Sequence, residues 1–479
     1  MTVFPASAVF FLIWLVLSFR DADRGIPMTI AVLPFGMFAG AVVGGLSILL
    51  AQALAMLTIG VLMLRWVSLG AVQANESGGM LPVLPRAALW LAIFALYALF
   101  SSLILVRLFQ GRFMVFPMSV TFSGTPVSRY FPSTMTPLYP SNSNFAQAGY
   151  ILLSSGFFLA TVLVVRRRGL AFVERGMVWA AGINLALGAL DFAALDGLLS
   201  LIRTADYSLA NKHTVSGLPR IIGGFAEASS FGSVSAGFFG YFMISYLIGR
   251  RTRDGALAWL SFSATVMSLS STGLAALGVA LMLVALHARS YLRPGISRVF
   301  AHVLVILVAV LAIVISLTMV LTPALEMISK VLDKLVFSKG TTLSGMERGA
   351  WAQAGFDAFV ETWGLGAGVG SLRSNGLTAV LLGTVGVPGT LAFLGFVWQA
   401  VGRPSQSEDF EVRRVFTAAR IGTLTILASM LVSGTTPDPT LLIATFAALA
   451  VAAQEIGERA ARSGSDPLDE GQRLAVNDS

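Results

Sequence analysis

The chain has 479 residues, of which 56% are hydrophobic and only 12% charged, and its mean hydropathy is +0.81. Soluble domains carry about 25% charged residues, so this composition excludes a soluble globular protein and predicts one that is dissolved in lipid. The net charge of +8 does not indicate nucleic-acid binding, because basic loops between spans set orientation and meet anionic lipid headgroups. The chain has no cysteine, which excludes disulfides, thiolate nucleophiles and cysteine-based metal sites.

Apolar runs recur along the chain, and a run of about 20 residues crosses a bilayer as a helix. We expect an all-α polytopic membrane protein with about thirteen spans, between roughly 12 and 14. We expect residues 1–455 to form one transmembrane domain and 456–479 to form a disordered cytoplasmic tail, because the small and charged residues of the tail cannot bury a core. The expected spans are Phe4–Phe19, Ile26–Gly45, Leu46–Leu64, Ala87–Phe109, Phe145–Val165, Gly176–Leu199, Ser229–Gly249, Ala256–Ser270, Gly273–Leu286, Val299–Leu321, Leu377–Val401, Ala418–Val432 and Leu441–Gln454.

Clusters of arginine fall in alternate loops and predict the orientation of the spans. The clusters are Arg166–Arg168, Arg250–Arg253, the group around Arg293, and Arg413–Arg414. The positive-inside rule places all of them on the cytoplasmic side. The short acidic sequence at Asp21 and Asp23 then lies on this side too, as a solvated loop rather than a metal site.

Three loops on the opposite, outer side are long: about 110–144, 201–228 and 322–375. The last is the main outer loop, and it contains two amphipathic patterns. One begins at Pro323 and predicts a helix on the membrane surface. The other has apolar residues at i, i+3, i+4 and i+7 from Phe356 to Trp363.

The outer loops carry more basic residues than the charge rule predicts. Arg220, Arg348 and Arg373 each lie beside glycines and next to a span, where a guanidinium fork can hold a phosphate group. We interpret these three arginines as a binding site for an anionic headgroup. The other outer basic residues are secondary candidates or members of solvated helix faces: Arg203, Lys212, His213, Lys330, Lys334 and Lys339.

A glycine-rich loop joins the second amphipathic pattern to the next span, with Gly366, Gly368, Gly370 and Ser371 at its centre. No strand precedes it, so it is not a dinucleotide-binding fingerprint, and no lysine follows it, so it is not a Walker loop. Successive backbone amides of such a loop can form a concave anion site. The alternative is an ordinary turn.

Two carboxylates are candidates for a general base. Glu227 directly precedes an expected span, and a carboxylate there can deprotonate an acceptor hydroxyl. Asp191 lies about 24 Å from Arg175 along the expected helix, near the outer boundary of the membrane. Ionisable groups at such depth are functional candidates. The alternative for Asp191 is a structural ion pair with Arg203 or Arg220.

The sequence from Arg220 through Gly223-Gly224-Phe225 to Phe231 resembles the arginine-glycine-phenylalanine signature of the O-antigen ligase and Wzy polymerase superfamily. The block from Arg348 through the glycine loop to Gly386-Val-Pro388-Gly389 is similar to the conserved domain of that superfamily. The serine-rich turn Ser270–Gly273 also occurs where these proteins have one. The resemblance covers roughly residues 200–400.

This resemblance implies a GT-C-like helical fold in a bacterial inner membrane, with a periplasmic active site. It implies glycosyl transfer from an undecaprenyl-pyrophosphate-linked saccharide, without metal, nucleotide sugar or other cofactor. The partners it implies are the lipid-linked saccharide, membrane lipid, a flippase and a chain-length regulator, with no nucleic acid. The outer-loop arginines of the superfamily correspond to Arg220 and Arg348 in this chain, with Arg373 as a third candidate.

The ligase branch of the superfamily usually has a histidine after the glycine loop, and this chain has Arg373-Ser374-Asn375-Gly376 there. We therefore expect a polymerase of repeat units in exopolysaccharide or O-antigen synthesis. The alternatives are an O-antigen ligase, a lipid or polysaccharide transporter, and a peptidoglycan polymerase of the shape, elongation and division type.

Overall fold

A computed structural model describes residues 4–43, 46–77, 84–118, 125–126, 134–205, 214–215, 218–291, 343–405 and 407–463. In these ranges the chain is mostly helical. The helices are α1 (Pro5–Arg20), α2 (Gly25–Ala31), α3 (Leu50–Ser77), α4 (Arg86–Phe100), α5 (Val106–Leu108), α6 (Asn142–Arg168), α7 (Leu170–Phe192), α8 (Asp196–Leu199), α9 (Ala228–Gly249), α10 (Thr252–Met267), α11 (Ser271–Tyr291), α14 (Leu343–Glu361), α15 (Leu377–Val397), α16 (Phe410–Ser433) and α17 (Thr440–Ser463), with short helical turns η1 (Ala22–Arg24), η2 (Ser101–Leu105) and η5 (Trp398–Gly402). The strands are β1 (Ala39–Val43), β2 (Leu46–Leu49), β3 (Met114–Val115), β4 (Thr125–Pro126), β5 (Thr134–Pro137), β6 (Thr214–Val215) and β7 (Leu218–Pro219).

The expected helical membrane protein is confirmed, with fewer spans than expected in the described ranges. Nine helical segments there are long and apolar enough to cross a membrane. Helices α1 and α10 have 16 residues each and are shorter than a full span. The expected span Val299–Leu321 lies outside the described residues.

The expected span Ile26–Gly45 is wrong. Helix α2 ends at Ala31, and the chain turns through Pro34 into strand β1, which pairs antiparallel with β2 so that Val43 lies opposite Leu46. Proline lacks the backbone N–H that a continuing helix needs and disfavours helical backbone before it. The segment is apolar because it is buried in the protein, as Ile30 and Phe38 show, and not because it crosses lipid.

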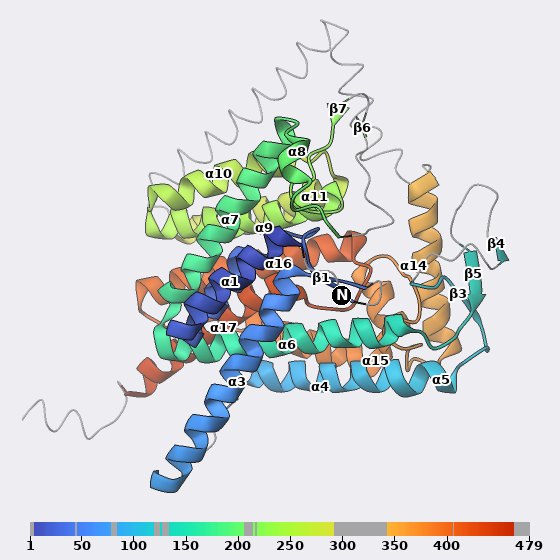
Figure 1. Cartoon of the computed structure of the whole chain (residues 1–479), viewed down its shortest axis with the longest axis horizontal. Helices are drawn as coiled ribbons and strands as arrows, with labels where there is room; N and C mark the ends of the chain where they lie inside the picture. The colour runs from blue at the N-terminus through green and yellow to red at the C-terminus, as the bar shows by residue number, and fades with distance from the viewer. Residues whose placement is uncertain are drawn as a thin grey trace, which may run out of the picture.

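Helices α4, α6, α15 and α17 run roughly alongside one another, and α14 crosses one end of this bundle at a steep angle to α15 (Figure 1, orange). The small sheet β3–β5–β4 lies at the same end. We call this the α14 end. Helix α14 includes the predicted amphipathic pattern except Trp363, which lies beyond its end at Glu361. The helix begins at Leu343, so Arg348 lies inside it. Its exposed apolar side includes Val360, and small residues such as Ala358 are buried on its other side.

The opposite end of the bundle (Figure 1) holds Arg166–Arg168, three of the arginines predicted to be cytoplasmic, so we call it the basic end. Arg293 lies outside the described residues. Arg166 pairs with Glu455 of α17 at 2.5 Å, and Arg167 pairs with Asp23 at 2.6 Å. Asp23 therefore lies with the arginine clusters, as predicted, in ion pairs rather than as a solvated loop. Helix α17 continues to Ser463, so the first part of the expected disordered tail is helical. The remainder lies outside the described residues.

Candidate functional site

One ion pair holds the segment that leads into α9. Asp191, at the end of α7, accepts a 2.7 Å bond from Nη2 of Arg203, and its other oxygen accepts bonds of 2.7 and 3.1 Å from the backbone N–H groups of Ile222 and Gly223. Arg203 also donates to the Gly223 carbonyl at 2.6 and 3.1 Å. Both oxygens of Asp191 thus have partners. The geometry favours the structural ion pair over the predicted catalytic base, and it gives Arg203 the same structural role.

The turn clamped by this pair requires its two glycines. Gly223 has a φ of +56°, and a Cβ there would lie 2.8 Å from the ring of Phe231. A Cβ on Gly224 would collide with the backbone oxygen of Pro34. Only glycine combines this backbone conformation with such close packing. The turn fixes the chain on both sides of it, and therefore the positions of the arginine before it and the carboxylate after it.

The glycine loop has a different role from the predicted anion site. Gly366, Gly368 and Gly370 are buried with φ of +89°, +101° and +78°, and a Cβ on each would collide with backbone of other segments. The amide of Gly366 donates to a threonine hydroxyl at 3.0 Å, and that of Gly368 donates to an α15 carbonyl at 3.0 Å. The Ser371 hydroxyl donates to the carbonyl of Gly368 at 2.7 Å. These groups form hydrogen bonds with one another and with neighbouring segments, so the loop is packed inside the protein. We call this packed loop the wedge.

The wedge enters a break in α15. Gly386 interrupts that helix with a φ of +58°, and the amide of Val387 donates instead to the carbonyl of Gly364 at 2.8 Å. At its other end the loop presents Arg373. The Arg373 amide donates to Phe116 O at 2.6 Å, and its guanidinium lies 5.0 Å from the centre of the Trp351 ring. The glycines therefore position an arginine rather than bind an anion themselves.

The structure brings together charged residues that lie far apart in the sequence. Burial lowers the pKa of the Arg220 guanidinium, Glu227 acts in the opposite direction, and the nearby charge of Arg348 lowers it further. Burial also lowers the pKa of Arg373, opposed by Glu347 and Glu227. Each arginine is thus held in a place where its charge is poorly solvated. Such a site gains free energy when an anion enters it.

Two buried donors at this site have no partner in the described part of the chain: Nε of Arg220 and Nε1 of Trp351. Leaving a buried polar group unsatisfied costs about 1–3 kcal/mol, and most such groups in native proteins are paired. Because both are N–H groups that only donate, the missing partner is an acceptor. Together with the arginines, they indicate a ligand with anionic oxygens.

A cavity of about 620 Å³ is lined by two residues of this site, Arg373 and Glu227. Asp438, in the turn between α16 and α17, also lines this cavity, and its Oδ1 has no partner in the described ranges. Burial raises the pKa of Asp438 to about 7, against hydrogen bonds from Ser154 and the Thr440 backbone. The sequence analysis missed this residue. The signal was the sequence Pro437-Asp438-Pro439, which places a carboxylate in a rigid turn between two spans.

Some predicted site residues lie outside the described residues: Lys212, His213, Lys330, Lys334 and Lys339. Within the described ranges, no group of three or more His, Asp and Glu residues is placed to hold a metal ion.

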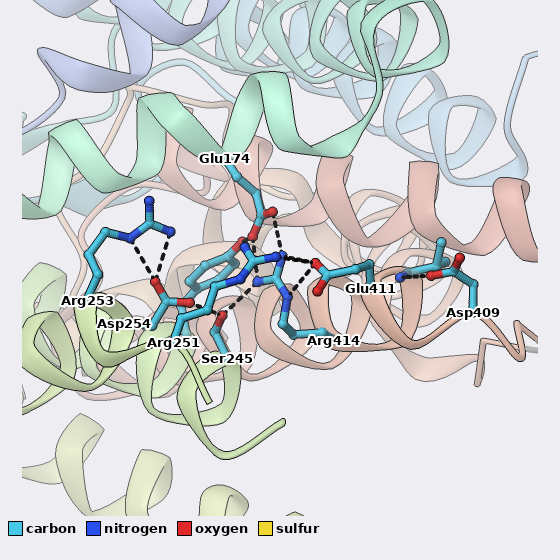
Figure 2. A network of polar contacts seen from close by, with 10 residues as sticks. Glu174, Ser245, Arg251, Arg253, Asp254, Asp409, Glu411 and Arg414 are labelled. Atoms are coloured by element: carbon cyan, nitrogen blue, oxygen red, sulfur yellow. Dashed lines mark hydrogen bonds and ion pairs between the residues drawn. The ribbon is translucent and has the colours of Figure 1, made fainter. Parts of the chain in front are cut away.

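A second polar cluster, near the basic end, is saturated with internal contacts (Figure 2). Arg414, 1% exposed, binds both oxygens of Glu174 at 2.9 and 2.7 Å and Glu411 at 2.8 Å. Ser245 accepts from Arg414 at 2.7 Å and donates to Asp254 at 2.7 Å. The cluster joins α7, α9, α10 and α16. Its groups satisfy one another, so it acts as a structural link and not as a ligand site.

No protein-family model matches the chain, and comparison with the curated proteins finds no matching relative.

Proposed function

We propose that this protein is a membrane glycosyltransferase that polymerises saccharide repeat units carried on undecaprenyl pyrophosphate. In this proposal the fold is GT-C-like, the membrane is a bacterial inner membrane, and the α14 end faces the periplasm. One observation carries the proposal. Arg220 and Arg373, from separate segments, both interact electrostatically with Glu227, and the charge of Arg348 acts on Arg220, while two buried N–H donors lack an acceptor in the described ranges. A pyrophosphate supplies the missing acceptor oxygens.

The reaction needs stabilisation of its leaving group. The acceptor hydroxyl forms a bond to the anomeric carbon of the donor sugar, the bond from that carbon to the pyrophosphate oxygen breaks, and the lipid pyrophosphate leaves with the electron pair. The negative charge that develops on the leaving oxygen is stabilised by the arginines. Donors aimed at developing charge contribute about 3–4 kcal/mol each in a water-poor site.

The acceptor hydroxyl also loses a proton, and we assign that proton to Asp438. A general base works best when its pKa is near the working pH, and the pKa of Asp438 is about 7. Its Oδ1 is unpaired among the described residues and its side chain lines the cavity. Glu227 accepts a 2.8 Å bond from Ser229 and lies among the arginines. We assign Glu227 to holding those guanidinium groups in place.

Two alternatives use the same site. An O-antigen ligase would perform the same chemistry with a different acceptor, and the absence of a histidine after the glycine loop favours the polymerase. A transporter is favoured by one specific feature, the break in α15 at Gly386, because interrupted helices line many transport sites.

The test compares lipid-linked saccharides, separated by size, in cells that contain only one variant of the protein. Arg348→Ala should cause single repeat units to accumulate on the carrier while long polymer disappears. Arg112→Ala is the matched control, since Arg112 is an exposed arginine at the α14 end that contacts Phe109 and Trp363 instead. Membrane expression of both variants is measured in parallel.

Long polymer that stays on the carrier would identify a ligase. Loss of all outward-facing lipid-linked saccharide would indicate a transporter. An unchanged saccharide pattern in both Arg348→Ala and Arg220→Ala, at normal expression, would refute the proposal.

A further inference from the structure

A second cavity of about 660 Å³ lies between α3 and α6. Helix α3 leaves the bundle at an angle to α6 (Figure 1). The cavity is a groove lined by residues of these two helices and by Ile48 of β2. Its lining is apolar apart from Trp66, Tyr150 and Arg167. Nothing in the catalytic proposal uses this groove.

The groove adjoins the polar cavity of the candidate site. Tyr150 and Leu153, neighbours on α6, line both cavities. A molecule with an anionic head and an apolar tail could therefore place its head beside Arg373 and its tail between α3 and α6. The polarity of the lining changes at this junction from acidic, basic and hydroxyl groups to aliphatic ones.

The length of the groove indicates what kind of tail it fits. On α6 the lining runs from Phe145 to Arg167, a distance of about 33 Å along the helix. The hydrocarbon core of a bilayer is about 30 Å thick, so one acyl chain of a phospholipid reaches only about half of this. A groove that extends from near the α14 end to the basic end suits a single chain that is longer than any ordinary acyl chain.

Glycines keep the groove open. Gly60 on α3 and Gly149 on α6 line it, and a Cβ built on either would have no atom within 4 Å in the described structure. Both lie in helices, where glycine costs about 0.5–1 kcal/mol relative to alanine. A side chain at either position would therefore occupy the groove instead of packing against another segment.

We infer that the groove between α3 and α6 binds the polyisoprenoid chain of the lipid carrier, with its pyrophosphate at Arg220 and Arg373. This inference rests on the proposed function, because that function supplies the identity of the head. The groove then selects donors by the length of the lipid. It also holds the anomeric carbon of the first sugar at a fixed depth relative to the arginines.

The test measures binding of polyprenyl pyrophosphates that carry no sugar to purified protein in detergent, and so does not depend on turnover. Wild type should bind a long, C55 chain more tightly than a ten-carbon chain with the same head. Gly149→Leu and Gly60→Leu place a side chain in the groove at positions where the added Cβ meets no other atom, and should weaken binding of the long chain by about tenfold or more while leaving the short chain unchanged. Gly182→Leu is the matched control, since Gly182 also has open space around it, in α7 and outside the groove.

The outcomes separate this inference from the proposed function. If the long and short chains bind equally to wild type, and Arg220→Ala abolishes both, the pyrophosphate site stands and the groove inference is overturned. If a two-chain phospholipid competes as well as the long polyprenyl chain, the groove holds ordinary bilayer lipid and the inference is again overturned. If no pyrophosphate binds but a photoreactive C55 polyprenol labels α3 and α6, the groove inference stands and the proposed function fails.

Discussion

The substitution Asp438→Asn should make the protein more stable at neutral pH and less active. Burial raises the pKa of this carboxyl group from 3.8 to about 7. The folded state therefore holds the proton more tightly than the unfolded chain does, and stability is full below pH 4 and falls as the pH rises through 7. Each pKa unit corresponds to about 1.4 kcal/mol. The free energy of unfolding is therefore lower by about 4 kcal/mol once the pH exceeds 7 than it is below pH 4. Asparagine does not ionise and avoids this loss.

The assay is thermal unfolding of the purified protein in detergent between pH 4 and pH 8, with activity measured on the same samples. The melting temperature of wild type should fall relative to that of Asp438→Asn as the pH rises, and the two should be close at pH 4. Activity of the variant should drop by roughly 100-fold or more, as expected for a lost general base. A difference in melting temperature between wild type and Asp438→Asn that stays constant from pH 4 to pH 8 would refute the assigned pKa. Wild-type turnover in the variant would refute the role as base.

Three further substitutions test structural roles. Arg414→Ala removes one partner from a buried ion cluster and should lower the free energy of unfolding by about 3–5 kcal/mol, measured by denaturant or heat, with little change in activity per folded molecule. Gly366→Ala should reduce the yield of folded protein because of its φ of +89° and its contact with other backbone, whereas Gly349→Ala, in open space on α14, should be neutral or slightly stabilising. Asp191→Asn should loosen the turn held by Arg203 and lower the affinity for pyrophosphate, whereas unchanged binding would show that the turn does not need the ion pair.

Sequence alone identified the membrane class, because an apolar chain with so few charges cannot be folded in water. It located most long helices, since spans such as 145–165 and 377–401 have the length that lipid requires. It failed at 26–45, where apolar residues are buried by protein rather than by lipid. Composition cannot distinguish these two environments, because both exclude water.

The choice of arginines also came from sequence, since glycines and adjacent spans mark positions 220, 348 and 373. Their meeting did not, because it depends on α14 crossing the end of the bundle and on the wedge of glycines in the broken α15. The tertiary structure alone showed that Asp191 is fully paired, that the Oδ1 atom of Asp438 is buried without a partner among the described residues, and that an apolar groove adjoins the polar cavity. Hydrophobicity and charge are properties of each residue and can be seen in the sequence. Pairing, desolvation and open space are relations between segments, and they exist only once the chain is packed.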